Sequence, residues 1–164
     1  MIRRVLMISL LVISSYVSFA QTSNENSNSG PQQDSLSWRF DSSRDPGKDL
    51  NEAIITATQT HKRILLDVGG EWCIWCRRLD TLFATHSDLS SFLNGHFVVV
   101  KVNYSKENKN EKFLSRFPKI PGYSHYFVLE HDGALLKSQD TGELEEGKGH
   151  SPSKVMTFLK TWAQ

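Results

Sequence analysis

This chain of 164 residues has few cysteines, a small net charge and few long apolar segments. Two cysteines are too few for a framework of several disulfides, so a hydrophobic core must hold the fold together. The formal net charge of +1 provides no basic surface, which argues against nucleic-acid binding. No internal repeat is visible, and the length suits one domain of about 150 residues. The sequence therefore predicts a single globular domain of ordinary composition.

The one long apolar run, residues 5–20, follows two arginines and ends in a small-residue pattern at Ala20. This arrangement is typical of a secretory signal peptide, with cleavage after residue 20. A membrane anchor is the alternative, but serines interrupt the run and it is shorter than the roughly 20 apolar residues that a spanning helix needs. We therefore expect an exported protein, periplasmic or secreted, with no membrane span after cleavage.

Residues 21–36 consist almost entirely of serine, asparagine, glutamine, glycine and other polar residues. Such a segment cannot build a core, which predicts a flexible linker. Residues 37–164 then remain for the folded domain.

Hydrophobic periodicity predicts the order of elements in this domain. An edge strand is expected at 38–40, and Ser87 and Ser151 are expected to cap the helices that follow them. Asp132-Gly133 is a hairpin signal, so the two last strands should pair antiparallel. The order predicts an α/β fold with a mixed central sheet and helices on both faces. The expected helices are 46–60, the segment from the cysteines to 85, 87–94, 111–117 and 152–162; the other strands are 63–68, 97–102, 126–129 and 134–136.

The two cysteines lie in the sequence Glu71-Trp72-Cys73-Ile74-Trp75-Cys76, where a buried strand gives way to a helix. Free backbone N–H groups and the helix dipole favour an anion at a helix start, so Cys73 should have thiolate character. Arg77 and Arg78 either add to this positive field or lie solvated on the helix face. Outside the cytosol the pair will form a disulfide unless it is kept reduced.

This motif at a strand-to-helix junction resembles the active site of the thioredoxin superfamily. Asp67, six residues before the first cysteine, stands where thioredoxins carry a buried acid. Residues 122–133 resemble the last hairpin of the family, and 133–147 are most similar to exported bacterial thioredoxin-like proteins. The likeness covers about residues 38–163. It implies a thioredoxin fold, closed by a β-hairpin and a C-terminal helix, and a thiol–disulfide oxidoreductase without an organic cofactor.

Cys73 lies at the helix start, where the positive field favours a thiolate, so we expect it to be the nucleophile that attacks a substrate disulfide. We expect Cys76 to resolve the mixed disulfide. Asp67, buried beneath the sulfurs, would take or give the proton of Cys76; the alternative is an aspartate bound to a backbone amide at the strand end. The spacer Ile74-Trp75 lacks the histidine that strongly oxidising relatives carry. This absence favours a reductant or a middling potential.

The candidate substrate-binding residues are Trp72, Trp75, Tyr123, Ser124 and His125. Counting back from the hairpin signal places Ser124 where the family normally carries a cis-proline. Pro121, three residues earlier, is the alternative, but using it would put a gap in an otherwise continuous match. A cis bond before any other residue costs about 3 to 4 kcal/mol, so we expect the Tyr123–Ser124 peptide to be trans. Ser124 and His125 would then present a hydroxyl and an imidazole to the site.

Two alternatives from other classes stay open. One is a metal-handling module or metallochaperone that uses both cysteines and a histidine, for which His86, His125 and His131 are candidates. The other is a binding module whose cysteines are incidental, since a disulfide of this spacing closes almost no loop and stabilises little. For the oxidoreductase we expect protein disulfides and dithiols as substrates, an unidentified redox partner, no nucleic acid and a monomeric state.

Overall fold

The computed structural model describes residues 39–163 of the chain. The signal peptide and linker predicted for residues 1–36 lie outside the described residues. No helix within 39–163 is both long enough and apolar enough to cross a bilayer. The helices are α1 (Pro46–Thr60), α2 (Ile74–Thr85), α3 (Ser87–His96), α4 (Glu111–Leu114), the 3-10 helix η2 (Thr141–Leu144) and α5 (Pro152–Trp162). The strands are β1 (Arg63–Gly69), β2 (Phe97–Asn103), β3 (His125–Leu129), β4 (Leu135–Asp140), β5 (Glu145–Glu146) and β6 (Gly149–His150).

The central sheet has the strand order β2-β1-β3-β4. Strand β1 pairs with β2 in parallel and with β3 antiparallel, and β3 and β4 form an antiparallel hairpin. Gly133 lies in the turn of this hairpin with φ +90°, a backbone conformation that glycine adopts without a steric penalty. The predicted mixed sheet and antiparallel last pair are thus confirmed.

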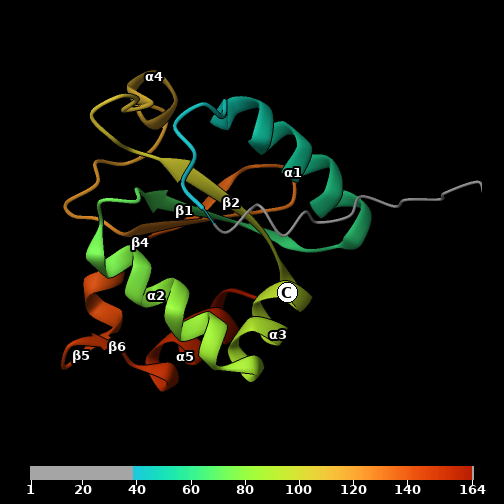
Figure 1. The fold of residues 1–164 in the computed structure, drawn as a ribbon. Helices are drawn as coiled ribbons and strands as arrows, with labels where there is room; N and C mark the ends of the chain where they lie inside the picture. Colours follow the sequence, from blue (N-terminus) through green and yellow to red (C-terminus); the bar gives the residue numbers. More distant parts are fainter. Residues whose placement is uncertain (1–38, 164) are drawn as a thin grey trace, which may run out of the picture. The chain divides into compact units, whose positions relative to one another are not determined.

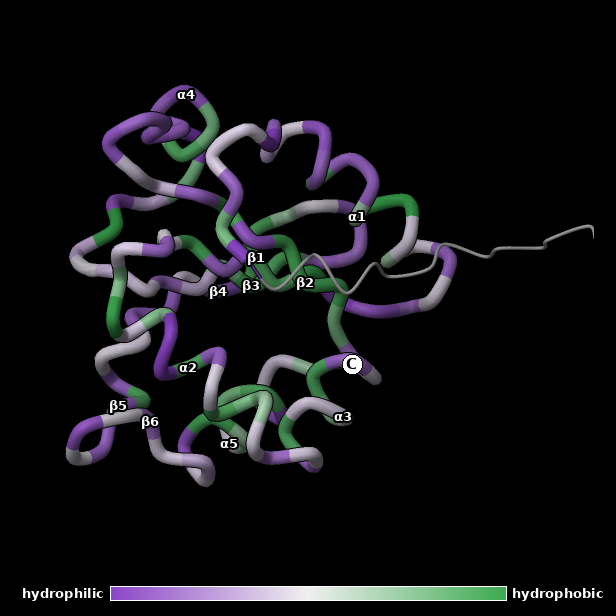
Figure 2. Tube along the Cα trace, viewed as in Figure 1, coloured by the Kyte–Doolittle hydropathy of each residue, from purple (hydrophilic) through white to green (hydrophobic). Residues whose placement is uncertain are grey.

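Helices cover both faces of the sheet, α1 and α4 on one side and α2, α3 and α5 on the other (Figure 1). Side chains alternate along β1: Ile64, Leu66 and Val68 join the core beneath α1, whereas Leu65 joins the core beneath α2. Apolar residues therefore concentrate in the inner strands, as the hydropathy colouring shows (Figure 2). This α/β arrangement is the predicted fold class.

Several predicted elements differ from the structure: the strand expected at 134–136 is longer, Leu135–Asp140, and the helix expected at 87–94 ends at His96. Of the edge strand expected at 38–40, residues 39 and 40 are described and form no strand, because the N–H of Phe40 donates to Glu71 Oε1 at 2.9 Å instead of to a neighbouring strand. The helix expected at 111–117 ends at Leu114, since Phe117 precedes a proline and its N–H turns back to the Leu114 carbonyl.

The caps and the C-terminal region also differ in detail from expectation. His86, not Ser87, is the N-cap of α3, because His86 has the extended backbone and its carbonyl accepts the Ser90 N–H. Ser151 is the N-cap of α5 as predicted, although its side chain makes no capping hydrogen bond. Helix η2 and the short β5–β6 hairpin were not expected from the sequence, since two-residue strands leave no periodicity to detect.

Candidate active site

Cys73 and Cys76 form a disulfide at the start of α2. Cys73 is the N-cap residue with an extended backbone, and its Sγ accepts the backbone N–H of Cys76 at 3.1 Å. Both residues are buried, at 3% and 1% exposure. The Cys73 sulfur therefore occupies the place where a helix N-terminus stabilises negative charge.

The end of β1 packs directly against the disulfide. A Cβ atom added at Gly69 would overlap Sγ of Cys76 and lie 3.0 Å from the Phe40 ring. Phe40 itself packs against both cysteines, although it belongs to the segment before α1. Only a residue without a side chain leaves room for the inner sulfur at this point.

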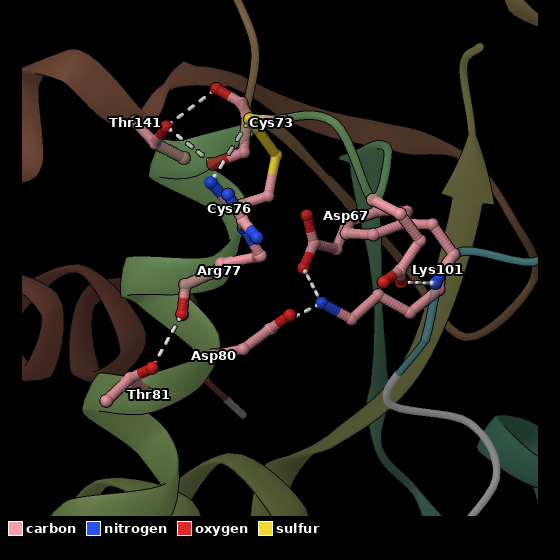
Figure 3. A network of polar contacts seen from close by, with 11 residues as sticks. Asp67, Cys73, Cys76, Arg77, Asp80, Thr81, Lys101 and Thr141 are labelled. Carbon is pink, nitrogen blue, oxygen red and sulfur yellow. Dashed lines mark hydrogen bonds and ion pairs between the residues drawn. A yellow bond between two sulfur atoms is a disulfide. The ribbon is translucent and has the colours of Figure 1, made fainter.

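An ion-paired triad of buried Asp67, buried Lys101 and half-buried Asp80 lies beneath the disulfide (Figure 3). Lys101 Nζ on β2 donates to Asp67 Oδ2 on β1 at 2.7 Å and to Asp80 Oδ1 on α2 at 2.5 Å. The ammonium also lies 4.4 Å from the centre of the Phe40 ring, within cation–π distance. The second carboxyl oxygen of Asp67, Oδ1, is buried with no hydrogen-bond partner within the described part of the chain.

Charges inside this triad shift the pKa of Lys101 and the pKa of Asp80. Burial alone would lower the pKa of Lys101, but Asp67 and Asp80 outweigh it and raise the pKa. Burial raises the pKa of Asp80 to about 6; Lys101 opposes this shift and Asp67 adds to it. Burial and the same two carboxylates also raise the pKa of Tyr126 well above its ordinary range. The lysine thus stays charged, and Asp80 is the member that can gain a proton near neutrality.

Aromatic residues border the cysteines on the side of β2. Trp72 and Ile74 are 57% and 47% exposed, and the Trp72 indole N–H donates to the Tyr104 carbonyl at 2.7 Å. Tyr123 stacks on Tyr104 with ring centres 4.5 Å apart and meets the Trp72 ring edge-on at 5.9 Å. Burial, followed by the neighbouring Tyr104, raises the pKa of Tyr123 to about 12. A partly exposed apolar surface therefore adjoins the disulfide.

Trp75, the other tryptophan of the motif, is fixed between two side chains. The Arg78 guanidinium lies 4.6 Å from the centre of its ring, and the His150 ring of β6 meets it edge-on at 5.7 Å. His150 is buried, and neither of its ring nitrogens has a hydrogen-bond partner in the part described. Burial lowers the pKa of His150; Asp67 opposes the shift and Arg78 adds to it.

The expectation of a trans peptide between Tyr123 and Ser124 is wrong, because the structure has this bond in cis. Ser124 directly precedes β3, and Thr141 of η2 engages both of its polar groups. The Thr141 hydroxyl donates to the Ser124 carbonyl at 2.6 Å, and the two side-chain oxygens lie 2.9 Å apart. Thr141 is remote in the sequence, so these contacts could not enter the expectation. The Ser124 hydroxyl is bonded to Thr141 and is not free.

The three histidines considered as metal ligands have partners other than the cysteines. His125 is 2% exposed, and its Nε2 lies 2.8 Å from Ser138 Oγ on β4. Burial lowers the pKa of His125, and Asp140 opposes this. Nδ1 of His86 lies 3.0 Å from the Leu82 carbonyl, and Nδ1 of His131 lies 3.0 Å from Glu130 Oε1. Within residues 39–163, no three His, Cys, Asp or Glu residues are grouped so that they could hold a metal ion.

Four residues around the pair were not identified from the sequence: Phe40, Asp80, Lys101 and His150. Lys101 had a detectable signal, since a lysine inside an otherwise apolar strand needs a buried partner. Asp80 lies one helical turn after Cys76 and so shares its face of α2. Phe40 and His150 come from a loop and a two-residue strand, where no periodic pattern could have indicated them.

A four-stranded mixed sheet between two helical layers, with a Cys-x-x-Cys disulfide at the start of α2, defines a thioredoxin fold with the active-site arrangement of a thiol–disulfide oxidoreductase. The sequence profile of the Thioredoxin-like family matches residues 45–130, which is more than half of the chain. The chain belongs to this family.

Individual relatives agree with this assignment. The chain is 27% identical over 119 residues to the disulfide bond reductase DsbH of Chlamydia pneumoniae, covering 66% of this chain and 69% of that protein. A disulphide isomerase from Xylella fastidiosa Temecula1 has a similar structure, with TM-score 0.64, 23% identity and coverage of 74% of this chain and 94% of that one. The reduced C-terminal domain of Neisseria meningitidis DsbD matches with TM-score 0.52 and 18% identity, covering 71% and 96%. The two solved structures support the fold.

Proposed function

We propose that the protein is an exported thiol–disulfide oxidoreductase that exchanges disulfides with other proteins and works as a reductant or at a middling potential. The observation that carries the proposal is the Cys73–Cys76 disulfide at the start of α2, with the Cys73 sulfur accepting a helix N–H at 3.1 Å. A reactive thiolate needs such a site, and a purely structural bridge does not.

In the reducing direction, the Cys73 thiolate attacks one sulfur of a substrate disulfide. A mixed disulfide between Cys73 and the substrate forms, and the other substrate sulfur leaves as a thiolate. The Cys76 thiolate then attacks Sγ of Cys73, which releases the second substrate thiolate and forms the Cys73–Cys76 disulfide. Two electrons pass to the substrate, and a dithiol partner must return them to the cysteine pair before the next cycle.

Asp67 is the candidate base for the second step. Its Oδ2 is held by Lys101 at 2.7 Å, whereas Oδ1 is buried without a partner in the described structure. A buried, unpartnered carboxyl oxygen can accept the proton that Cys76 must lose before it attacks. Lys101 fixes the carboxyl orientation while leaving that oxygen available.

The surface around the cysteines supports binding of a polypeptide. Trp72 provides an exposed aromatic surface, Trp75 lies within the motif, and Tyr123 joins Trp72 at the edge of the site. Ser124 and His125 keep their proposed place in the substrate-binding loop; because both side chains are buried, their part would be through the backbone. The spacer without histidine and the reductase name of the Chlamydia relative favour the reducing direction.

Reduction of insulin in the presence of dithiothreitol tests the activity. The protein should accelerate the precipitation of reduced insulin chains, and a Cys73→Ser/Cys76→Ser variant should not. Equilibration with glutathione buffers should give a potential between about −270 and −180 mV. A reduced protein that binds zinc stoichiometrically and leaves insulin intact would instead support the metal-handling alternative.

Export is tested separately on the full chain. Expression in a Gram-negative host, followed by fractionation, should place the protein in the periplasm with Gln21 at its N-terminus. Uncleaved protein in the membrane fraction would favour an anchor. Sedimentation equilibrium of the processed protein tests the expected monomer.

A further inference from the structure

A groove runs along α2 from the cysteine pair, between the exposed side of this helix and strand β6. Ile74, Arg77, Arg78 and Thr81 line it at helical spacing, and Gly149 and His150 line it from β6. The groove has a volume of about 340 Å³ and begins at the residue that follows Cys73. A chain held there would therefore continue directly to the nucleophile.

The charges along this groove are of one sign. Both arginines line it, no acidic residue is among the described residues that line it, and no ion pair in the described structure involves either arginine. Arg78 stacks on the Trp75 ring at 4.6 Å. Stacking covers the flat face of a guanidinium but leaves its N–H edge free, and that edge binds carboxylates in a bidentate manner.

His150 provides a second, independent indication of a ligand. Its ring lines the groove and is 7% exposed, and both ring nitrogens are buried without a hydrogen-bond partner in the described part of the chain. A buried polar group without a partner is costly unless another molecule supplies one. A small rotation of the ring would bring one nitrogen to the surface of the groove, where a bound segment of substrate would supply the missing partner.

We propose that this groove binds an acidic side chain of the substrate protein, an aspartate or glutamate close in sequence to the disulfide that Cys73 attacks. The inference rests on the proposed function and names its substrate class: polypeptide disulfides flanked by carboxylates. Arg77 and Arg78 bind the carboxylate, and His150 closes the groove beside Trp75.

Single-turnover reduction of matched peptides tests the inference. Three peptides carry the same intramolecular disulfide, flanked by glutamate, glutamine or lysine, and the pre-reduced enzyme is mixed with each. The wild type should reduce the glutamate peptide about tenfold faster than the glutamine peptide. Arg77→Gln/Arg78→Gln should bring this ratio to about one. Arg77→Glu/Arg78→Glu should reverse the preference in favour of the lysine peptide, a gain that misfolding cannot produce.

The matched control is Lys106→Gln/Lys109→Gln, which removes two positive charges from a separate cavity beside Trp72. This variant should keep the wild-type ratio. If both double variants lose the preference for the glutamate peptide equally, the preference comes from the overall charge of the protein. That result would overturn the proposal that the groove binds the carboxylate. A wild type that reduces the three peptides equally fast would also overturn it, while leaving the proposed function intact. Failure to reduce any of them would overturn both.

Discussion

Asp67 and Lys101 are direct cross-strand partners of β1 and β2, and their side chains form a buried ion pair at 2.7 Å. The parallel register of the two strands therefore places a cation next to the carboxyl group beneath the disulfide. Asp80 adds a second carboxylate to the same ammonium from α2. The paired strands β1 and β2 and the helix α2 thus each contribute one side chain to a charged cluster beneath the cysteines.

Asp67→Asn should slow the resolution of the mixed disulfide at neutral pH by at least about tenfold, because it removes the buried base proposed for Cys76. The amide keeps the shape of the side chain. Quenched-flow measurement of the two steps as a function of pH checks this. The first attack by Cys73 serves as the internal control and should keep its rate. A pH profile of the second step that is identical to wild type would reduce Asp67 to a structural residue.

Cys76→Ser should accumulate mixed disulfides with substrate proteins, whereas Cys73→Ser should not. The reason is that Cys73 occupies the N-cap and accepts a helix N–H, while Cys76 is the more deeply buried sulfur beside Gly69. Non-reducing gels with mass spectrometry of the trapped species check the result. Trapping by the Cys73 variant instead would reverse the two roles.

Elements with strong periodicity could be predicted from the sequence. The strand at 97–102 and the helix at 46–60 need no distant information, because their own residues specify strand and helix. Asp67 could be placed beneath the cysteines because it belongs to the strand that leads into their helix. Local patterns and the family resemblance together located the centre of the site.

Part of the surroundings of the cysteines could not be predicted, because it comes from contacts distant in sequence. Phe40 packs against the pair from a loop, and His150 contacts Trp75, the neighbour of Cys76, from a two-residue strand. The cis peptide before Ser124 accompanies contacts with Thr141, which lies beyond the whole β3–β4 hairpin. The residue types alone favour a trans Tyr123–Ser124 peptide, and only the tertiary structure shows that Thr141 contacts Ser124.

Gly69→Ala should lower the free energy of unfolding of the oxidised protein by about 1 to 3 kcal/mol, because its Cβ would overlap Sγ of Cys76. Gly95→Ala is the matched control: a Cβ added there meets no atom within 4 Å, and the residue lies in α3. This second change should raise stability by about 0.5 to 1 kcal/mol. Urea unfolding measures the free energy of unfolding of both variants. Equal changes in the two variants would show that the space at Gly69 is not restricted.

The contribution of Asp80 to the stability of the oxidised protein should fall as the pH rises from about 4 to about 6. Burial raises the pKa of Asp80 from its ordinary 3.8 to about 6, so the folded protein retains in this range a proton that the unfolded chain has already released. The loss can amount to at most about 3 kcal/mol, because the pKa of about 6 already includes the opposing effect of Lys101. Asp80→Asn should remove most of this slope, whereas Asp88→Asn, which changes an exposed carboxyl of α3, should keep it. Urea unfolding between pH 4.5 and 7.5 measures the difference, and an unaltered slope in the Asp80 variant would mean that another group takes up the proton.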